Sequence, residues 1–161
     1  EAVIDLEPLS KFPVVRDLAV DRSGARERLR RVKAWVELGG SAAEPRTPRV
    51  GKAPAEALEW AASPCIACGA CLEACPEVHP RSDFVGAAAI HEARLAIDAM
   101  GNTEPARRRL DALIGPGGVA DCGKSNNCVE ACPMSLPLDE SIAAMARATT
   151  LHITARLRRR G

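Results

Sequence analysis

The sequence predicts a mainly α-helical fold arranged around two cysteine-rich loops. All seven cysteines of the 161 residues fall within two short stretches that share one spacing. The longer segments between and after these stretches carry apolar residues at helical spacing and end at Gly or Pro. Strand-like sequence is limited to a few residues at the start. Together these observations favour a helical frame that holds two cysteine loops.

The two cysteine stretches are copies of one motif. The first reads Cys65-Ile-Ala-Cys68-Gly-Ala-Cys71-Leu-Glu-Ala-Cys75-Pro76, and the second reads Cys122-Gly-Lys-Ser125-Asn-Asn-Cys128-Val-Glu-Ala-Cys132-Pro133. The spacing C-x2-C-x2-C-x3-C-P is typical of iron–sulfur proteins. In them three thiolates bind one cluster, while the fourth, followed by Pro, binds the neighbouring cluster. The doubled motif therefore predicts two clusters with crossed ligands.

The crossing rule divides the cysteines into a set of four and a set of three. The first set, predicted to bind a [4Fe–4S] cluster, is Cys65, Cys68, Cys71 and Cys132. The second set, predicted to bind a [3Fe–4S] cluster, is Cys75, Cys122 and Cys128. Ser125 stands where a fourth cysteine of the second set would be. A serine oxygen can in principle bind iron, so Ser125 is an alternative ligand.

Zinc and disulfides explain the cysteines less well. Structural zinc sites take four ligands, usually as two pairs, and seven cysteines do not divide into fours. Disulfides need an oxidising compartment, and an odd count leaves one thiol over. Free thiolates indicate a reducing compartment instead.

Composition limits the classes of function. The net charge of +1 argues against general nucleic-acid binding. No apolar run reaches the roughly 18–20 residues that span a bilayer, and no secretory signal peptide is evident. We therefore expect a soluble or peripheral cytoplasmic protein. With no Tyr and two Phe, the clusters are expected to supply much of the cohesion of the fold.

Before the first motif, the sequence predicts one strand and two helices. Residues 2–6 are β-prone, and we interpret residues 1–8 as the end of a preceding domain. Asp21 can cap a helix over residues 22–35, whose arginines are expected to form a solvated face. Residues 39–54 are predicted to form a surface loop, and residues 55–62 a short helix with Trp60 near a cluster.

After the first motif, three longer helices are predicted, completing a domain over residues 9–161. Ser82 or Asp83 can start a helix that ends at Gly101, and a second helix runs from Thr103 to Gly115. These two form a hairpin inserted between the motifs. The third helix spans residues 138–158. Its predicted apolar stripe is Leu138, Ile142, Met145, Ala146, Thr149 and Ile153.

The three histidines receive separate predictions. His91 and His152 lie on predicted helices and are expected to be structural. His79 follows Cys75-Pro76, so it is expected near the three-iron cluster, where it can contact a redox partner.

The motifs resemble those of one known family. Cys65-Ile-x-Cys68-Gly-x-Cys71-Leu-Glu-Ala-Cys75-Pro, Leu136-Pro-Leu-x-x-Ser-Ile-Ala and the upstream Phe12-Pro-Val-Val-Arg-Asp-Leu are similar to the C-terminal half of the iron–sulfur subunit of succinate dehydrogenases and fumarate reductases. The likeness covers nearly the whole chain. The surroundings of Gly123 and Asn127 look most like bacterial members that use menaquinone and a dihaem cytochrome b.

Two features depart from this family. Its N-terminal domain, which binds a [2Fe–2S] cluster, has no counterpart here, and residues 1–8 resemble the join between the two domains. Some members also line a quinone pocket with Trp after the Cys-Pro and His after the first cysteine of the second motif. Here Gly123 occupies the second place and no Trp follows Pro76. Pro76 alone keeps the family residue.

The resemblance implies an electron relay. An FAD-containing flavoprotein partner would oxidise succinate, so this chain would have no succinate-oxidising site. Electrons would pass through [2Fe–2S], [4Fe–4S] and [3Fe–4S] clusters to quinone or haem b in a membrane anchor. The chain would then lie on the cytoplasmic face of the bacterial inner membrane. Pro76 and Lys124 are the residues expected to face the quinone or haem.

Two alternatives remain open from the sequence. One is a free-standing dicluster ferredoxin, although such carriers are usually acidic and this chain is near neutral. The other is the iron–sulfur subunit of a different oxidoreductase, of the glycolate oxidase or heterodisulfide reductase type. The upstream Phe-Pro-Val-Val-Arg-Asp-Leu segment disfavours the second.

Overall fold

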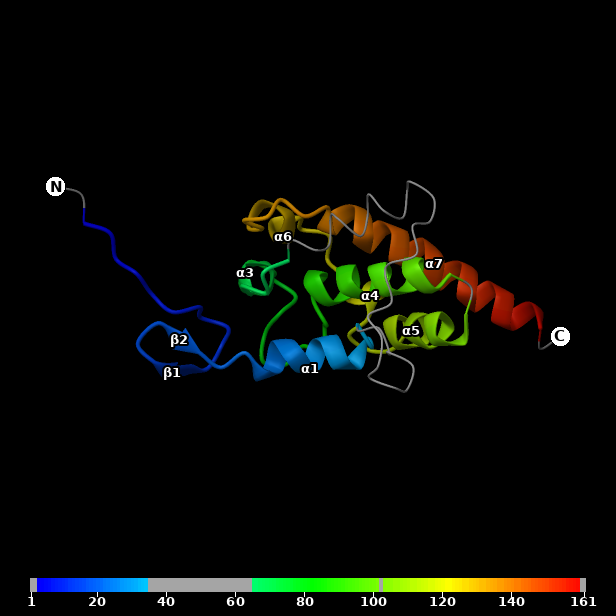
Figure 1. Cartoon of the computed structure of the whole chain (residues 1–161), viewed down its shortest axis with the longest axis horizontal. Helices are drawn as coiled ribbons and strands as arrows, with labels where there is room; N and C mark the ends of the chain where they lie inside the picture. The colour runs from blue at the N-terminus through cyan, green and yellow to red at the C-terminus, as the bar shows by residue number, and fades with distance from the viewer. Residues whose placement is uncertain (1–2, 35–64, 102, 160–161) are drawn as a thin grey trace, which may run out of the picture.

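A computed structural model describes residues 3–34, 65–101 and 103–159. Its elements are β1 (Val14–Arg16), β2 (Ala19–Val20), α1 (Ser23–Arg31), α3 (Ala70–Glu73), α4 (Ala87–Met100), α5 (Glu104–Ile114), the 3-10 turn η1 (Val119–Asp121), α6 (Asn127–Glu130) and α7 (Leu138–Arg158). The long helices α4, α5 and α7 pack against one another, and α1 packs on α4. The short helices α3 and α6 lie together at one end (Figure 1). The predicted mainly helical fold is confirmed for the described residues.

The N-terminal strand prediction is wrong for the residues that the structure describes. Residues 3–9 have no regular structure, and Val3, Ile4 and Leu6 are exposed. The strands form later, where β1 and β2 pair antiparallel across a turn at Asp17 with φ of 49°. An isolated strand leaves its backbone groups unpaired, whereas a hairpin pairs them locally.

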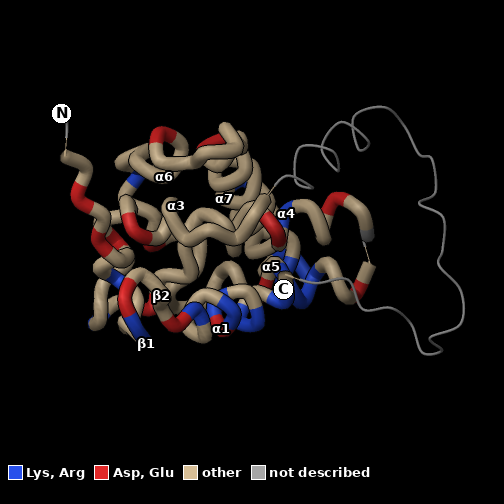
Figure 2. The backbone as a smooth tube through the Cα atoms, turned by 60° about the vertical axis from the view of Figure 1, so that its left-hand side comes forward, with Lys and Arg blue, Asp and Glu red and all other residues tan. Residues whose placement is uncertain are grey.

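The prediction that the arginines of α1 form a solvated face is wrong for Arg28 and Arg31. Arg31 donates hydrogen bonds to the carbonyls of Asp83 (2.7 Å) and Pro116 (2.9 Å), and Arg28 donates to the carbonyl of Phe84. These contacts fasten α1 to the segments that precede α4 and η1. Because a guanidinium has several donors in a fixed plane, it can bridge separate chain segments. Figure 2 shows the basic positions gathered along α1 and near α5.

The predicted hairpin between the motifs is confirmed, with one boundary shifted. Helix α5 begins as expected, with the Thr103 side chain accepting a hydrogen bond from the Ala106 amide. Helix α4 starts at Ala87 rather than near Ser82, because Gly86 adopts φ of 88°. A Cβ at Gly86 would lie 2.3 Å from Leu72 Cδ2, so the chain passes closely over α3 here. This contact joins the hairpin to the first cysteine loop.

Helix α7 has the predicted bounds and most of the predicted stripe. Leu138, Ile142, Met145 and Thr149 are buried, while Ala146 is partly buried. Ile153 departs from the prediction with 40% exposure, and Leu157 is also exposed. In Figure 1 the last turns of α7 extend past the other helices, so no described element covers these two residues.

Buried polar side chains join α4 to α7. His91 is fully buried, and its Nδ1 lies 2.7 Å from Ser141 Oγ. Ser141 Oγ donates to the Pro137 carbonyl (3.0 Å), so we assign the Nδ1 proton to His91, which then donates to the hydroxyl. His91 Nε2 is buried, and no described residue forms a hydrogen bond with it. The prediction that His91 is structural is confirmed.

Three predictions fall on residues that the structure does not describe. These are the loop over residues 39–54, the helix over residues 55–62, and the position of Trp60. Among the described helices, none combines the length and apolar character needed to cross a membrane.

Candidate iron–sulfur centres

The two cysteine loops share one backbone conformation. Ala67 and Lys124, at matching positions, have positive φ of 51° and 57°. Gly69 and Asn126, again matching, are both left-handed and immediately precede the one-turn helices α3 and α6. Since positive φ is rare outside Gly and Asn, its repetition at the same places is specific. The doubled sequence motif is therefore a doubled loop structure, and Ser125 occupies the place of Cys68.

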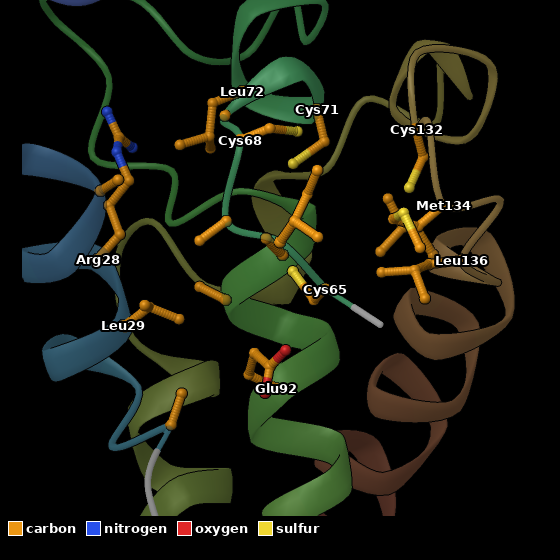
Figure 3. A pocket seen from close by; sticks show the side chains of 18 of the residues that line it. Arg28, Leu29, Cys65, Cys68, Cys71, Leu72, Glu92, Cys132, Met134 and Leu136 are labelled. Atoms are coloured by element: carbon orange, nitrogen blue, oxygen red, sulfur yellow. The ribbon is translucent and has the colours of Figure 1, made fainter. Parts of the chain in front are cut away.

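The four cysteines of the first set line one cavity of about 240 Å³. Cys65, Cys68 and Cys71 reach it from the first loop, and Cys132 reaches it from the second motif. Figure 3 shows the Cys71 and Cys132 sulfurs on opposite sides of this space, with Cys65 beneath them. The predicted crossing ligand therefore lies in the wall with its predicted partners.

The second set of cysteines forms a second group. Cys75 and Cys128 are buried and Cys122 is partly buried. Burial raises the pKa of the Cys128 thiol first, and the charges of Cys122 and Cys75 raise it further. Cys128 therefore lies near both Cys122 and Cys75. Cys75, which belongs to the first motif in sequence, is thus grouped with the second loop.

Electrostatics link the members of the first set with one another and, through Cys71, with Cys128 of the second set. Burial raises the pKa of Cys71 to about 11, and the neighbouring charges of Cys65, Cys68 and Cys128 raise it as well. The pKa of the Cys65 thiol is also raised, first by burial and then by the charges of Glu92, Cys132 and Cys68. Cys71 and Cys128 lie where the two groups approach each other. Thiolates gathered this way repel one another unless a cationic centre offsets their charge.

The four cysteines of the first set stand around a cavity, as the ligands of a cluster do. Within the described part of the chain, no three His, Cys, Asp or Glu side chains converge as they would around one metal ion. In a cubane cluster each thiolate binds a different iron, so the ligands must stand around a cavity instead. The cavity lined by Cys65, Cys68, Cys71 and Cys132 meets this requirement.

Contacts outside the loops hold them in place. Glu73 on α3 accepts hydrogen bonds from the backbone amides of Ser10 and Lys11, each at 3.0 Å. Arg22 donates to the Ala67 carbonyl (3.1 Å). Asn127 Nδ2 donates to the Ala74 carbonyl (3.1 Å), which ties the two motifs directly. The segment before α1 therefore acts as a brace for the first loop.

The face beside the second set is open. Pro76, His79 and Lys124 are exposed there, as is Ser125. Glu77 covers Gly123, because a Cβ on Gly123 would lie 2.3 Å from Glu77 Oε1. His79 Nδ1 accepts a hydrogen bond from the Arg81 amide at 3.3 Å. Glu77 thus occupies the space that a side chain at residue 123 would need.

Sequence reasoning missed two polar residues in the wall of the first cavity. Arg28 comes from α1 and Glu92 from α4 (Figure 3). Helical spacing could have indicated Glu92, because it lies on the same helical face as Ala88 and Ala89, which also line the cavity. Burial raises the pKa of the Glu92 carboxyl.

Comparison with known proteins agrees with this geometry. A family model described as a 4Fe-4S dicluster domain matches residues 61–136, which contain all seven cysteines. The chain is 45% identical over 157 residues to the succinate dehydrogenase iron-sulfur subunit of Bacillus subtilis, an alignment covering 94% of this chain and 59% of the relative. The chain is thus similar to the iron–sulfur subunits of succinate dehydrogenase and fumarate reductase.

Further iron–sulfur subunits support this relationship. Identity to the fumarate reductase iron-sulfur subunit of Wolinella succinogenes is 35% over 159 residues, covering 91% of this chain and 62% of the relative. Identity to that of Haemophilus influenzae is 34% over 140 residues, covering 80% and 54%. The chain thus spans between 54% and 62% of the length of these three relatives. The resemblance predicted from the cysteine motifs is confirmed.

Proposed function

We propose that the chain is the dicluster part of the electron-transfer subunit of a membrane-bound succinate:quinone oxidoreductase. It would receive electrons from an FAD-containing flavoprotein. It would deliver them to a quinone, proposed to be menaquinone, or to haem b in a membrane anchor. A [2Fe–2S] cluster in a preceding domain, joined near residues 1–8, would complete the relay. The chain would lie on the cytoplasmic face of the bacterial inner membrane and carry no succinate-oxidising site.

The observation that carries this proposal is the crossed grouping of cysteines. Cys132 lines the cavity of the first loop, and the charge of Cys75 couples to that of Cys128. A four-cysteine set and a three-cysteine set in one rigid frame support a [4Fe–4S] and a [3Fe–4S] cluster, whose chemistry is to accept and pass on single electrons. The protein supplies the thiolates, the amide donors and the apolar walls.

Hydrogen bonds to the sulfurs add to this support. The backbone amides of Ala67 and Ala88 bond to the thiols of Cys65 and Cys71. Ala88 lies in the first turn of α4, where amides have no partner inside the helix. Such bonds favour the thiolate over the thiol and tune cluster potential.

The exit for electrons is proposed at the open face of the second set. Pro76 and Lys124 are exposed on this face, beside the cysteines that would hold the three-iron cluster. Lys124 can donate to a quinone carbonyl or a haem propionate. Glu77 over Gly123 fits a docking geometry different from that of family members with a histidine at this place.

Purification from native membranes through a tag on the full-length chain tests the proposal. We expect a flavoprotein and a haem-bearing membrane subunit to co-purify, and succinate to reduce the clusters. A free-standing ferredoxin would purify alone, and an oxidoreductase of another type would bring other subunits without succinate-dependent reduction. Either of those results would contradict the proposal.

A further inference from the structure

One carboxylate and one guanidinium stand in the mainly apolar wall of the four-cysteine cavity. Of the described residues that line this cavity, Glu92 alone has a carboxylate and Arg28 alone has a cationic side chain. The remaining wall is made of the cysteines and of Gly, Pro and apolar residues, among them Leu72, Val85 and Met134. Glu92 is half-buried, so water screens its charge less than it would at the surface.

Glu92 is placed to act on the four-cysteine set rather than on the other set. In Figure 3 its carboxylate lies just below Cys65, projecting from α4. After burial and one backbone hydrogen bond, the charge of Glu92 is the largest influence on the pKa of Cys65, and it raises that pKa. The pKa of Cys128, in the second set, is raised first by burial and then by the charges of Cys122 and Cys75, with no contribution from Glu92.

No described side chain neutralises Glu92. None of the ion pairs or side-chain hydrogen bonds among the described residues involves it. Arg28, the cation in the same wall, donates to the Phe84 carbonyl and interacts electrostatically with Arg31, Cys75 and Asp83. Nearby on α4, Arg94 pairs with Asp98 (3.4 Å) and donates to Ser141 (3.2 Å).

We infer that Glu92 is a potential-setting residue whose carboxylate lowers the reduction potential of the four-iron centre relative to the three-iron centre. Reduction adds one electron to the cluster and so increases its negative charge. A fixed negative charge beside Cys65 opposes that addition, and net charge near a cluster is a main determinant of its potential. This role rests on the proposed cluster assignment and adds a reason for the two centres to differ.

The test is a potentiometric EPR titration of Glu92→Gln in the full-length chain, isolated with its clusters and any co-purifying subunits. Glutamine keeps the shape and removes the charge. Because burial raises the pKa of Glu92 above the ordinary glutamate value, the titration is run at about pH 8 to keep the wild-type carboxylate ionised. We expect the four-iron midpoint to rise by about 59 mV, which is a tenfold change in the reduction equilibrium for a one-electron couple. The three-iron midpoint should stay in place.

Two further variants make the outcome decisive. Glu92→Asp keeps the charge, so its four-iron midpoint should stay close to the wild-type value. Glu140→Gln removes an exposed carboxylate on α7 and should shift neither centre. An unchanged four-iron midpoint in Glu92→Gln, or an equal shift of both centres, would overturn the inference. If wild-type protein shows no four-iron signal at all, the cluster assignment itself fails, which is a distinguishable result.

Discussion

At the scale of single residues, Ser125 decides how many irons the second centre can hold. Its backbone occupies the place that Cys68 has in the first loop, because the flanking positive-φ residues match. Ser125→Cys therefore restores the missing thiolate without rebuilding the loop. We expect the three-iron centre to become a four-iron centre with a lower potential, seen as loss of its oxidised EPR signal. A retained signal with unchanged iron content would show that loop geometry, not the missing ligand, sets the cluster type.

Lys124 tests the proposed exit. It is exposed and has φ of 57°, a strain that Glu or Arg would bear equally. Lys124→Glu should slow succinate-to-quinone turnover severalfold, while succinate oxidation with an artificial acceptor at the flavin stays intact. Lys124→Arg keeps the charge and should retain most of the turnover. Equal loss of both activities would indicate misfolding, and loss of neither would place the exit elsewhere.

At the scale of elements, His91 makes the contact of α4 with α7 dependent on pH. Burial first, and then the charge of Arg94, lowers the pKa of His91 below 6.5. The unfolded chain therefore binds a proton more readily, so stability is lost as the pH falls from 6.5 toward the folded-state pKa. His91→Asn, whose amide can still donate to Ser141, should weaken this loss. Thermal unfolding of both proteins between about pH 7.5 and 5.5 measures it. Parallel pH profiles would assign the acid sensitivity to other groups.

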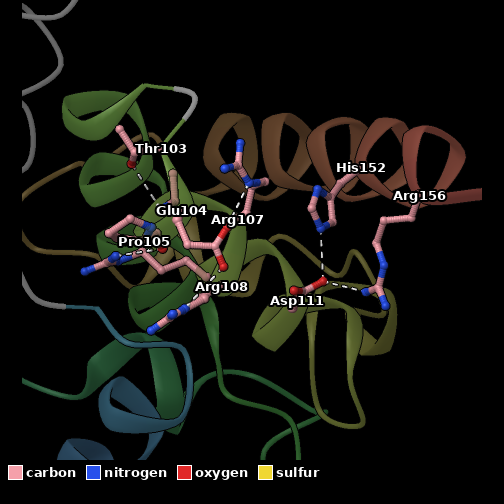
Figure 4. Close-up of polar contacts among 10 residues, drawn as sticks. Thr103, Glu104, Pro105, Arg107, Arg108, Asp111, His152 and Arg156 are labelled. Carbon is pink, nitrogen blue, oxygen red and sulfur yellow. Dashed lines mark hydrogen bonds and ion pairs between the residues drawn. The ribbon is translucent and has the colours of Figure 1, made fainter. Parts of the chain in front are cut away.

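A second element-scale contact joins α5 to α7. Asp111 Oδ1 accepts hydrogen bonds from His152 Nε2 (3.0 Å) and Arg156 Nη1 (2.7 Å), as Figure 4 shows. This confirms a structural role for His152. Asp111→Asn should cost about 0.5–1 kcal/mol, since the pair is partly exposed, and should speed hydrogen exchange in the last turns of α7.

Glu104 supplies the matched control for Asp111. It pairs with Arg107 and Arg108 inside α5, and those contacts lower the pKa of its carboxyl. Glu104→Gln should therefore leave exchange in α7 unchanged. The same change in α7 from both variants would assign the effect to α5 stability rather than to the contact with α7.

At the scale of the whole molecule, the sequence predicted what depends on local spacing. Cysteine periodicity identified both loops, and helical periodicity placed α5 and α7 at their observed bounds. The start of α4 was missed because the close approach of Gly86 to Leu72 is a tertiary contact. Two further features were missed for the same reason. These are the hydrogen bonds from Arg28 and Arg31 to the segment before α4, and the position of Glu92 in the cavity wall. From sequence alone a charged residue is predicted to be exposed, because the segment that packs against it is not known.

The central claim is that the two motifs exchange their last cysteine, so that each cluster is bound by both loops. EPR and Mössbauer spectra of Cys132→Ala and Cys75→Ala, in protein isolated with its clusters, test it most directly. The account predicts that Cys132→Ala, although it lies in the second motif, alters the four-iron centre and leaves the three-iron signal. Cys75→Ala should do the reverse. If each substitution instead damages only the cluster of its own motif, the crossed assignment is contradicted.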